Sequence, residues 1–129
     1  MENTKKFVLS ILSETLAICR FDEKSSIPEW AKGLSFCSIT RTKSELSIVC
    51  PQKNIPGGVL AEKGWRAFKL DGELGIASIG VIASLSNPLA EAGISIFNVS
   101  TFETNYVLVE EKNLAKAKEV LSKFCEIKA

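Results

Sequence analysis

The chain has 129 residues, of which 46% are hydrophobic and 24% are charged, a balance that excludes a disordered chain. Its 16 basic and 15 acidic residues are well mixed and give a formal net charge of +1, so no basic patch for nucleic acid is expected. No segment reaches the about 18 apolar residues of a membrane span, and the start of the chain lacks the apolar core and cleavage site of a signal peptide. We expect a cytoplasmic protein of one compact unit or two very small ones, with neither nucleic acid nor membrane as a partner.

Strand-like runs joined by polar turns fill the first half of the chain. We expect strands at residues 6–12, 15–21, 35–41 and 46–50. The first two flank Ser13-Glu14 and predict an opening hairpin, and the last two flank a polar turn and predict a second one. Between the hairpins, Pro28 and Gly33 bracket a short helix. Residues 51–64 hold two prolines and three glycines, which indicates a connector between two halves.

The second half has clearer periodicity. We expect strands at residues 65–70, 94–102, 105–110 and 125–128, and helices from Ser78 to Gly93 and over 114–124. Ser78 and Asn113 are placed to cap the two helices, and Gly93 is placed to stop the first. Pro88 lies inside that first helix, so we expect a kink or a break near Ser86-Asn87.

This order of elements predicts an α+β fold. The second half reads strand, helix, strand, strand, helix, strand, which is the ferredoxin-like βαββαβ motif. The first half reads strand, strand, short helix, strand, strand, and we interpret it as a degenerate copy of the same unit. We therefore expect two subdomains, over residues 1–62 and 63–129. Both faces of the strand at residues 94–102 mix apolar and polar residues. This mixture indicates that a neighbouring element covers the face away from the helices. Ordinary variation in a short strand explains the mixture almost as well.

Catalysis and metal binding have little support in the sequence. Histidine is absent, which excludes nucleophiles activated by a histidine base. The four cysteines form no closely spaced pair, so we expect no metal and no cofactor. Each cysteine borders an apolar run and is expected to be reduced and buried. We expect that the protein is not an enzyme; the remaining catalytic alternative uses Cys19 or Cys50 as a nucleophile.

Several motifs resemble one known family. They are ETLAICRF (14–21), SITRTKSELSIVCP (38–51), GWRAF (64–68), PLAEAGISIF (88–97) and STFETNYVLV (100–109). Together they are similar to small bacterial and archaeal proteins built from two tandem ACT domains, and more distantly to the animal cytosolic arginine sensors. The resemblance covers nearly the whole chain and implies the same βαββαβ fold.

The resemblance also implies a function, because ACT domains are regulatory modules that bind amino acids or related small ligands at an interface between domains. It places the ligand at the start of the first helix of the second half, beside the strand that follows. The residues implied to bind the ligand are Ser78, Ile79, Gly80, Val81, Phe97, Asn98, Ser100 and Thr101. Free backbone N–H groups at a helix start attract a carboxylate, and glycine at position 80 allows close approach. The alternative is that Ser78 is only a cap and Gly80 only relieves crowding.

Three positions depart from the family pattern. Ile79, Phe102 and Asn105 stand where relatives often carry threonine, tyrosine and aspartate. Each change removes a hydroxyl or a charge, and Asn105 argues against a cationic ligand. We expect a non-enzymatic amino-acid-binding protein that works as a homodimer or through a regulated partner protein. The alternative is an ACT-type dimerisation and protein-interaction module that has lost its ligand.

Overall fold

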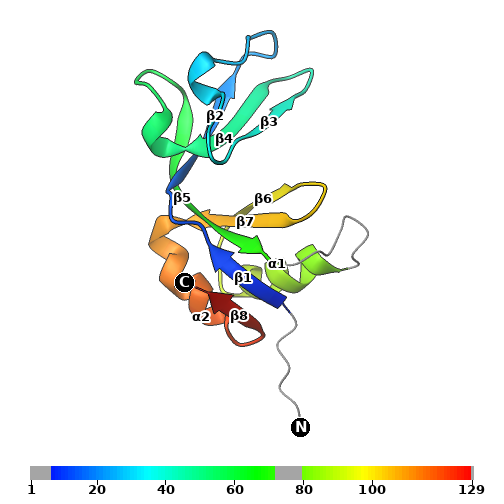
Figure 1. Cartoon of the computed structure of the whole chain (residues 1–129). Helices are drawn as coiled ribbons and strands as arrows, with labels where there is room; N and C mark the ends of the chain where they lie inside the picture. Colours follow the sequence, from blue (N-terminus) through cyan, green and yellow to red (C-terminus); the bar gives the residue numbers. More distant parts are fainter. Residues whose placement is uncertain (1–6, 72–79, 129) are drawn as a thin grey trace. The chain divides into compact units, whose positions relative to one another are not determined.

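The computed structural model describes residues 7–71 and 80–128 (Figure 1). The chain divides into two compact units. Unit 1 consists of Met1–Ser13 and Arg66–Ala129, and unit 2 of Glu14–Trp65. Strand β5 (Ala61–Leu70) therefore supplies its first half to unit 2 and its second half to unit 1. The division into subdomains at residues 62 and 63 stays a prediction.

Unit 1 has the predicted βαββαβ order, with one strand added. The elements after β5 are α1 (Val81–Glu91), β6 (Ile96–Ser100), β7 (Asn105–Glu110), α2 (Leu114–Leu121) and β8 (Cys125–Lys128). In the sheet, β7 pairs with β5 and with β6. The added strand is β1 (Phe7–Ile11), which lies between β5 and β8. It runs antiparallel to β5 and parallel to β8.

This position of β1 makes the predicted opening hairpin wrong. Strand β2 (Leu16–Phe21) pairs with β4 and β5 and not with β1. The physical reason is burial: Phe7 and Leu9 of β1 are core residues of unit 1. A two-stranded hairpin would leave such side chains uncovered, because an isolated hairpin is at best marginally stable.

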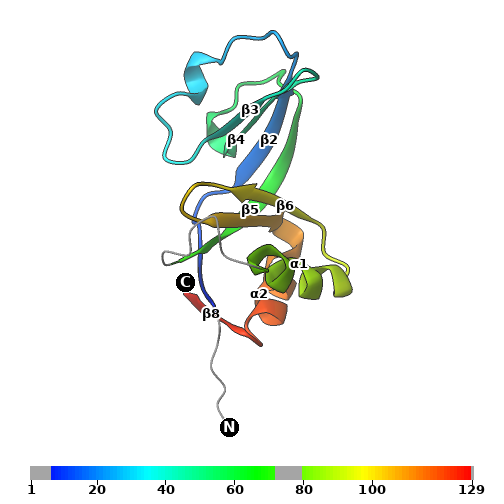
Figure 2. The same ribbon diagram turned by 90° about the vertical axis from the view of Figure 1, so that its right-hand side faces the viewer.

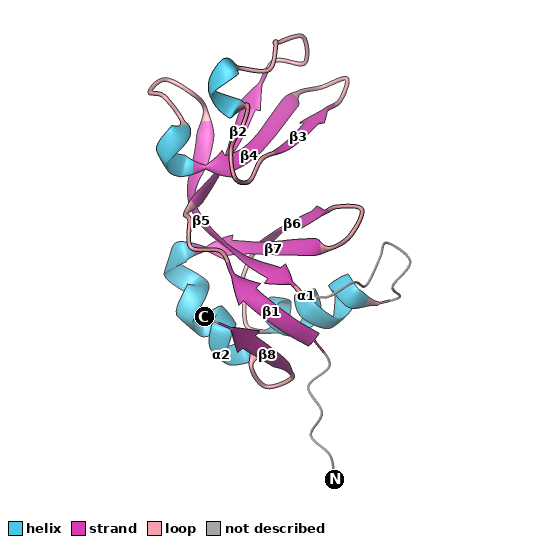
Figure 3. Cartoon of the chain, viewed as in Figure 1, coloured by secondary structure: helices cyan, strands magenta, loops and turns pink. Residues whose placement is uncertain are grey.

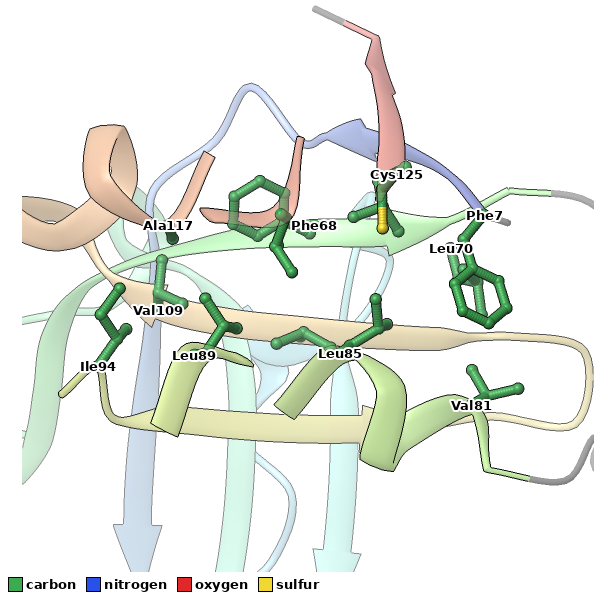
Figure 4. Close-up of a cluster of buried hydrophobic side chains, with 13 residues drawn as sticks. Phe7, Phe68, Leu70, Val81, Leu85, Leu89, Ile94, Val109, Ala117 and Cys125 are labelled. Atoms are coloured by element: carbon green, nitrogen blue, oxygen red, sulfur yellow. The ribbon is translucent and has the colours of Figure 1, made fainter. Parts of the chain in front are cut away.

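The helices α1 and α2 cover one face of the unit 1 sheet (Figure 2). Val81, Leu85 and Leu89 form the buried stripe of α1, at the spacing of successive helical turns. Figure 4 shows these side chains directed towards residues of the sheet. The buried core of unit 1 comprises Phe7, Leu9, Phe68, Leu70, Val81, Leu85, Leu89, Ile94, Val107, Val109, Ala117, Leu121 and Cys125. Leu114 packs against this core from the start of α2, and Phe124 packs against it from beyond the end of the helix, which stops at Leu121 and is shorter than the predicted helix over 114–124.

Both ends of α1 depend on glycine. Gly93 has a φ of 76°, and its N–H donates to the carbonyl of Ala90 at 2.9 Å. The N–H of Ile94 donates to the carbonyl of Leu89, also at 2.9 Å. These two bonds form a Schellman motif and confirm Gly93 as the helix stop. At the other end, Gly80 precedes the helix with a φ of 74°; the predicted cap Ser78 lies outside the described residues.

Of the predicted kink or break near Ser86-Asn87, the break is wrong, since α1 continues through Pro88. Proline removes one backbone donor and crowds the preceding turn. The buried residues Leu85 and Leu89 stand on either side of it, and their packing holds the helix together there. Asn113 precedes α2 as predicted, but its side chain makes no capping hydrogen bond. A short 3-10 turn over Glu111–Asn113 leads into α2 instead.

Among the described residues, unit 2 is a sheet accompanied by short 3-10 turns and no α-helix (Figure 3). Its strands β2, β3 (Ser38–Arg41), β4 (Leu46–Pro51) and the first half of β5 follow the order β3-β4-β2-β5. The predicted hairpin of β3 and β4 is confirmed, and the predicted short helix is a 3-10 turn over Glu29–Ala31. One cluster of buried residues in this unit consists of Cys19, Ala31, Leu46, Ile48 and Cys50. Across residues 7–71 and 80–128, neither α-helix has the length and apolar character needed to cross a membrane.

Candidate functional site

The predicted ligand residues at the start of α1 are only partly described. Ser78 and Ile79 lie outside the described residues. Gly80 is exposed, and its φ of 74° gives the reason for glycine at this position. Val81 is only 6% exposed and belongs to the core, with its side chain directed inwards (Figure 4). A ligand at this helix start would therefore contact the backbone of Val81 and not its side chain.

The polar side chains of the β6–β7 hairpin form hydrogen bonds with one another. The Asn98 Nδ2 atom donates to Ser100 Oγ at 2.9 Å, and Ser100 Oγ donates to Asn105 Oδ1 at 2.6 Å. Ser100 and Asn105 are direct partners in the strand register. Asn98 Oδ1 is buried and has no hydrogen-bond donor among the residues that the structure describes. Phe97, the apolar member of the predicted set, is half-buried in β6.

Thr101 and Thr104 close the hairpin loop. The Thr101 N–H donates to the Thr104 carbonyl at 2.8 Å, and the Thr104 N–H donates to Thr101 Oγ1 at 3.1 Å. The Thr104 hydroxyl in turn donates to the carbonyl of Leu70 at the end of β5. This last bond fixes the loop of residues 101–104 to the sheet.

A pocket of about 540 Å³ opens beside this loop. It is lined by Ser10, Lys69, Leu70, Asp71, Thr101, Glu103, Thr104, Tyr106 and Lys128, all of which belong to unit 1. Leu9 and Phe68 point into the core under the helices. Their neighbours Ser10 and Lys69 therefore point to the opposite face, because side chains alternate along a strand. The pocket thus lies on the face of the sheet that α1 and α2 leave free.

Strand register assembles the charged floor of this pocket. Ser10 of β1 lies opposite Lys69 of β5 and opposite Lys128 of β8. Directly paired residues share a face of the sheet, so the hydroxyl stands between the two lysines. Asp71 Oδ2 accepts a hydrogen bond from Ser10 Oγ at 2.6 Å and lies 3.4 Å from Lys128 Nζ. The Asp71 side chain is 22% exposed and that of Lys128 is 58% exposed.

The other two charged side chains of the pocket are unpaired within the described part of the chain. Lys69 stands on the floor, and Glu103 lies in the exposed hairpin loop. Neither side chain forms an ion pair or a hydrogen bond with another described residue. Among the described residues, the pocket therefore combines one bound charge pair with one available cation and one available anion.

Of the predicted ligand residues that the structure describes, only Thr101 lines this pocket. The predicted set did not include Ser10, Lys69, Asp71, Glu103, Thr104, Tyr106 and Lys128. The available signal was the polar residue at alternate positions of otherwise apolar strands, such as Ser10 within FVLSI. That signal marks a face of a strand but does not say which other strands share the face.

The cysteines offer no reactive group. Burial raises the pKa of the Cys19 thiol and raises the pKa of the Cys50 thiol to about 12. Both thiols are protonated at neutral pH, whereas the thiolate is the nucleophile, so the geometry argues against the cysteine-enzyme alternative. No group of three or more cysteine, aspartate or glutamate side chains among the described residues could hold a metal ion.

Comparison with known proteins identifies the fold and the family. Residues 60–123 match the family model of the ACT domain, and residues 14–58 match a model of an N-terminal domain. The chain is 32% identical to the human cytosolic arginine sensor for mTORC1 subunit 1 over 107 residues, which cover 77% of this chain and 32% of that protein. It thus spans about a third of the length of the curated relatives it matches.

Solved structures agree with this match. A protein from Agobacterium tumefaciens is 38% identical, with a TM-score of 0.89 over 95% of this chain and 92% of that chain. The ligand-free regulatory subunit of aspartate kinase from Thermus thermophilus is 12% identical, with a TM-score of 0.59 over 88% of this chain and 95% of that chain; this likeness shows the fold alone. The predicted fold class and family resemblance are confirmed, and the chain belongs to the family of small ACT-domain proteins.

Proposed function

We propose that this protein binds an amino acid or a related small ligand and regulates another process without catalysing a reaction itself. The observation that carries the proposal is a pocket in the ACT-domain unit that presents both basic and acidic side chains. Its volume lies in the range of about 300–1,000 Å³ usual for small-molecule sites. An amino acid carries one carboxylate and one ammonium group, and such a pocket can bind both.

The relatives support a regulatory role. The name of the human relative describes a cytosolic arginine sensor, and that of the Thermus neighbour describes a regulatory subunit. By analogy we place this chain in the cytoplasm and expect it to signal through a homodimer or a regulated partner protein. The absence of histidine and the protonated state of the buried Cys19 and Cys50 support a non-enzymatic role.

The start of α1 stays a second proposed place for the ligand. As the family resemblance implies it, this place comprises Ser78, Ile79, Gly80 and Val81, and we propose that Phe97, Asn98, Ser100 and Thr101 contribute to it. The Oδ1 atom of Asn98 supports it, since this atom is buried and has no donor among the described residues, and a buried acceptor without a donor is costly and rare. A ligand ammonium group would satisfy that atom.

Thermal unfolding of the full chain against a panel of the common amino acids tests the function. A ligand present at about one hundred times its Kd should raise the unfolding free energy by about 2.7 kcal/mol. We expect one chemical group of amino acids to raise the midpoint and the others to leave it unchanged. No change with any amino acid would contradict the proposal.

A ligand-free dimerisation and interaction module is the second candidate function. Asn98, Ser100 and Asn105 bind one another, which leaves fewer groups for a ligand and favours this alternative. Sedimentation velocity with and without the amino-acid panel discriminates between the two functions. A dimer whose stability does not depend on any amino acid supports the module; a ligand-dependent assembly supports the sensor.

A further inference from the structure

We infer that the pocket on the free face of the unit 1 sheet is the ligand site, and that it selects α-amino acids with an uncharged, polar side chain. The carboxylate of the ligand would bind Lys69 on the floor, and its ammonium group would bind Glu103 in the loop. This inference rests on the proposed amino-acid binding. It differs from the proposed site at the start of α1, which is built from other residues.

The charges of the pocket favour a ligand with one positive and one negative group. Among the described residues, its charged side chains are those of Lys69, Asp71, Glu103 and Lys128. Asp71 and Lys128 lie 3.4 Å apart and neutralise each other. Lys69 and Glu103 are left without a partner among the described residues. One available cation and one available anion match a zwitterion with no net charge.

One hydrogen bond joins the strand that carries Lys69 to the loop that carries Glu103. Lys69 stands one residue before Leu70, whose carbonyl accepts the hydrogen bond from the Thr104 hydroxyl. Glu103 is the residue directly before Thr104. The bond between Thr104 and Leu70 therefore keeps the loop that carries the anion beside the strand that carries the cation. This arrangement provides one partner for each end of an α-amino acid.

The lining of the pocket also limits the side chain of the ligand. A charged side chain would bring a surplus charge that has no available partner among the described lining residues, and an unpaired charge that loses its water is costly. The hydroxyl protons of Ser10, Thr101 and Thr104 are already donated, to Asp71, to the Thr104 carbonyl and to the Leu70 carbonyl. The oxygens of Ser10 and Thr104 keep acceptor capacity, so a ligand side chain that donates a hydrogen bond fits best. Hydroxyl and amide side chains have this chemistry.

The experiment is isothermal titration calorimetry on the full chain with serine, threonine, asparagine and glutamine, and with glutamate and lysine as charged competitors. The test variants are Lys69→Met and Glu103→Gln, which remove the charge and keep the length of the side chain. Lys116→Met and Glu119→Gln are the matched controls, because these residues are exposed on α2, which covers the other face of the sheet. Neither Lys69 nor Glu103 is buried, so all four variants should fold, and circular dichroism checks this.

We expect the wild-type chain to bind at least one of the uncharged polar amino acids and to bind glutamate and lysine more weakly. Each test variant should lose about tenfold or more in affinity, the size expected for one charge-assisted contact, and the controls should not change. Glu103→Gln leaves the pocket with one surplus positive charge, so it should also shift the preference towards glutamate. A merely structural role for Glu103 would not produce that shift.

Two outcomes overturn the inference in distinguishable ways. If the wild-type chain binds no amino acid at all, the proposed function fails and the inference fails with it. If the wild-type chain binds but Lys69→Met and Glu103→Gln bind equally well, the pocket is not the site and the function stands. A wild-type preference for glutamate or lysine overturns the inferred ligand class even where the two variants weaken binding.

Discussion

Unit 1 and unit 2 both contain a sheet of short strands, but only unit 1 covers its sheet with α-helices in the described residues. Helices of 11 and 8 residues pack on unit 1, whereas unit 2 has only 3-10 turns of three residues each. The helices give unit 1 the larger buried core. With one face of the sheet occupied in this way, polar residues can occupy the other face, where the pocket lies.

The sequence explains this difference locally. In α1, Val81, Leu85 and Leu89 recur at helical spacing and provide an apolar stripe. In unit 2, the corresponding segment begins at Pro28 and ends near Gly33, which has a φ of 73°. Because the proline and the glycine lie so close together, the segment between them is too short to form an apolar stripe. It forms a single 3-10 turn in which Ala31 is buried. We expect unit 1 to carry more of the stability of the protein.

The largest expected effect tests this asymmetry with the same substitution in each core. Leu85 of unit 1 is 1% exposed and Leu46 of unit 2 is 0% exposed. Leu85→Ala should lower the unfolding free energy by about 3–5 kcal/mol and Leu46→Ala by about 2–3 kcal/mol, because a smaller core relaxes more easily around a cavity. Urea unfolding measures both. Leu60→Ala, at a side chain that is 69% exposed, is the control and should change little.

Two optical probes follow the units separately in this experiment. Both tryptophans, Trp30 and Trp65, belong to unit 2, so their fluorescence reports its unfolding. Helical circular dichroism reports α1 and α2 of unit 1. Equal losses from both substitutions, or a larger loss from Leu46→Ala, would contradict the asymmetry.

The next effect in size concerns the end of α1. Gly93→Ala forces a residue with a side chain into a left-handed conformation, which costs about 1–2 kcal/mol. Gly33→Ala in unit 2 imposes similar strain but ends only a single turn. We therefore expect Gly93→Ala to reduce the helical signal as well as the stability, and Gly33→Ala to reduce stability only. Circular dichroism before and during unfolding measures both effects; an unchanged helical signal for Gly93→Ala would contradict the Schellman end.

These glycines show why the local structure of the chain could be predicted. Each signal that predicted it acts over a few residues. These signals are Gly93, the apolar stripes of α1 and α2, and the polar turns of two hairpins. The break predicted near Pro88 is absent from α1, because the effect of proline is local whereas the packing of Leu85 and Leu89 that outweighs it is tertiary. The partners of β1 could not be predicted, since β5 and β8 are distant in sequence and Ser13-Glu14 is an adequate turn signal.

The candidate site was harder to predict for the same reason. Its floor requires Ser10, Lys69 and Lys128 to lie side by side, and each comes from a different strand. No spacing within one segment contains this information. The family resemblance directed the prediction to the α1 start and the polar hairpin, and of the predicted ligand residues that the structure describes, Thr101 alone lines the pocket.

A smaller effect compares the turn threonines of the two units. Thr104 in unit 1 donates to the Leu70 carbonyl, and Thr42 in unit 2 accepts from the N–H groups of Ser44 and Glu45 at 3.1 Å each. Thr104→Val and Thr42→Val should each cost about 1 kcal/mol or less in a urea unfolding experiment. Only Thr104→Val should also weaken amino-acid binding, because only that bond holds the loop beside the pocket. Equal ligand affinity for Thr104→Val and wild type would contradict the role of this bond.

The effect that is smallest at neutral pH is the alkaline pH dependence of unit 2. Burial raises the pKa of the Cys50 thiol from 9.0 to about 12. Since the folded-state pKa lies above the unfolded one, the contribution to stability is fully present below pH 9.0 and is lost as pH rises towards about 12. Cys50→Ala should therefore flatten the fall of stability above pH 9.0, measured by tryptophan fluorescence in urea. Identical pH slopes for the two chains would contradict burial of this thiol.

The most direct measurement of the central claim is an NMR titration of the full chain with serine, threonine, asparagine or glutamine, followed through backbone amide chemical shifts. We predict saturable shifts of Ser10, Lys69, Asp71, Thr104 and Lys128, with unit 2 residues such as Ile48 unchanged. Shifts centred on Gly80, Val81 and Asn98 would move the ligand to the start of α1. No saturable shift anywhere in unit 1 would contradict the claim that this ACT domain binds an amino acid.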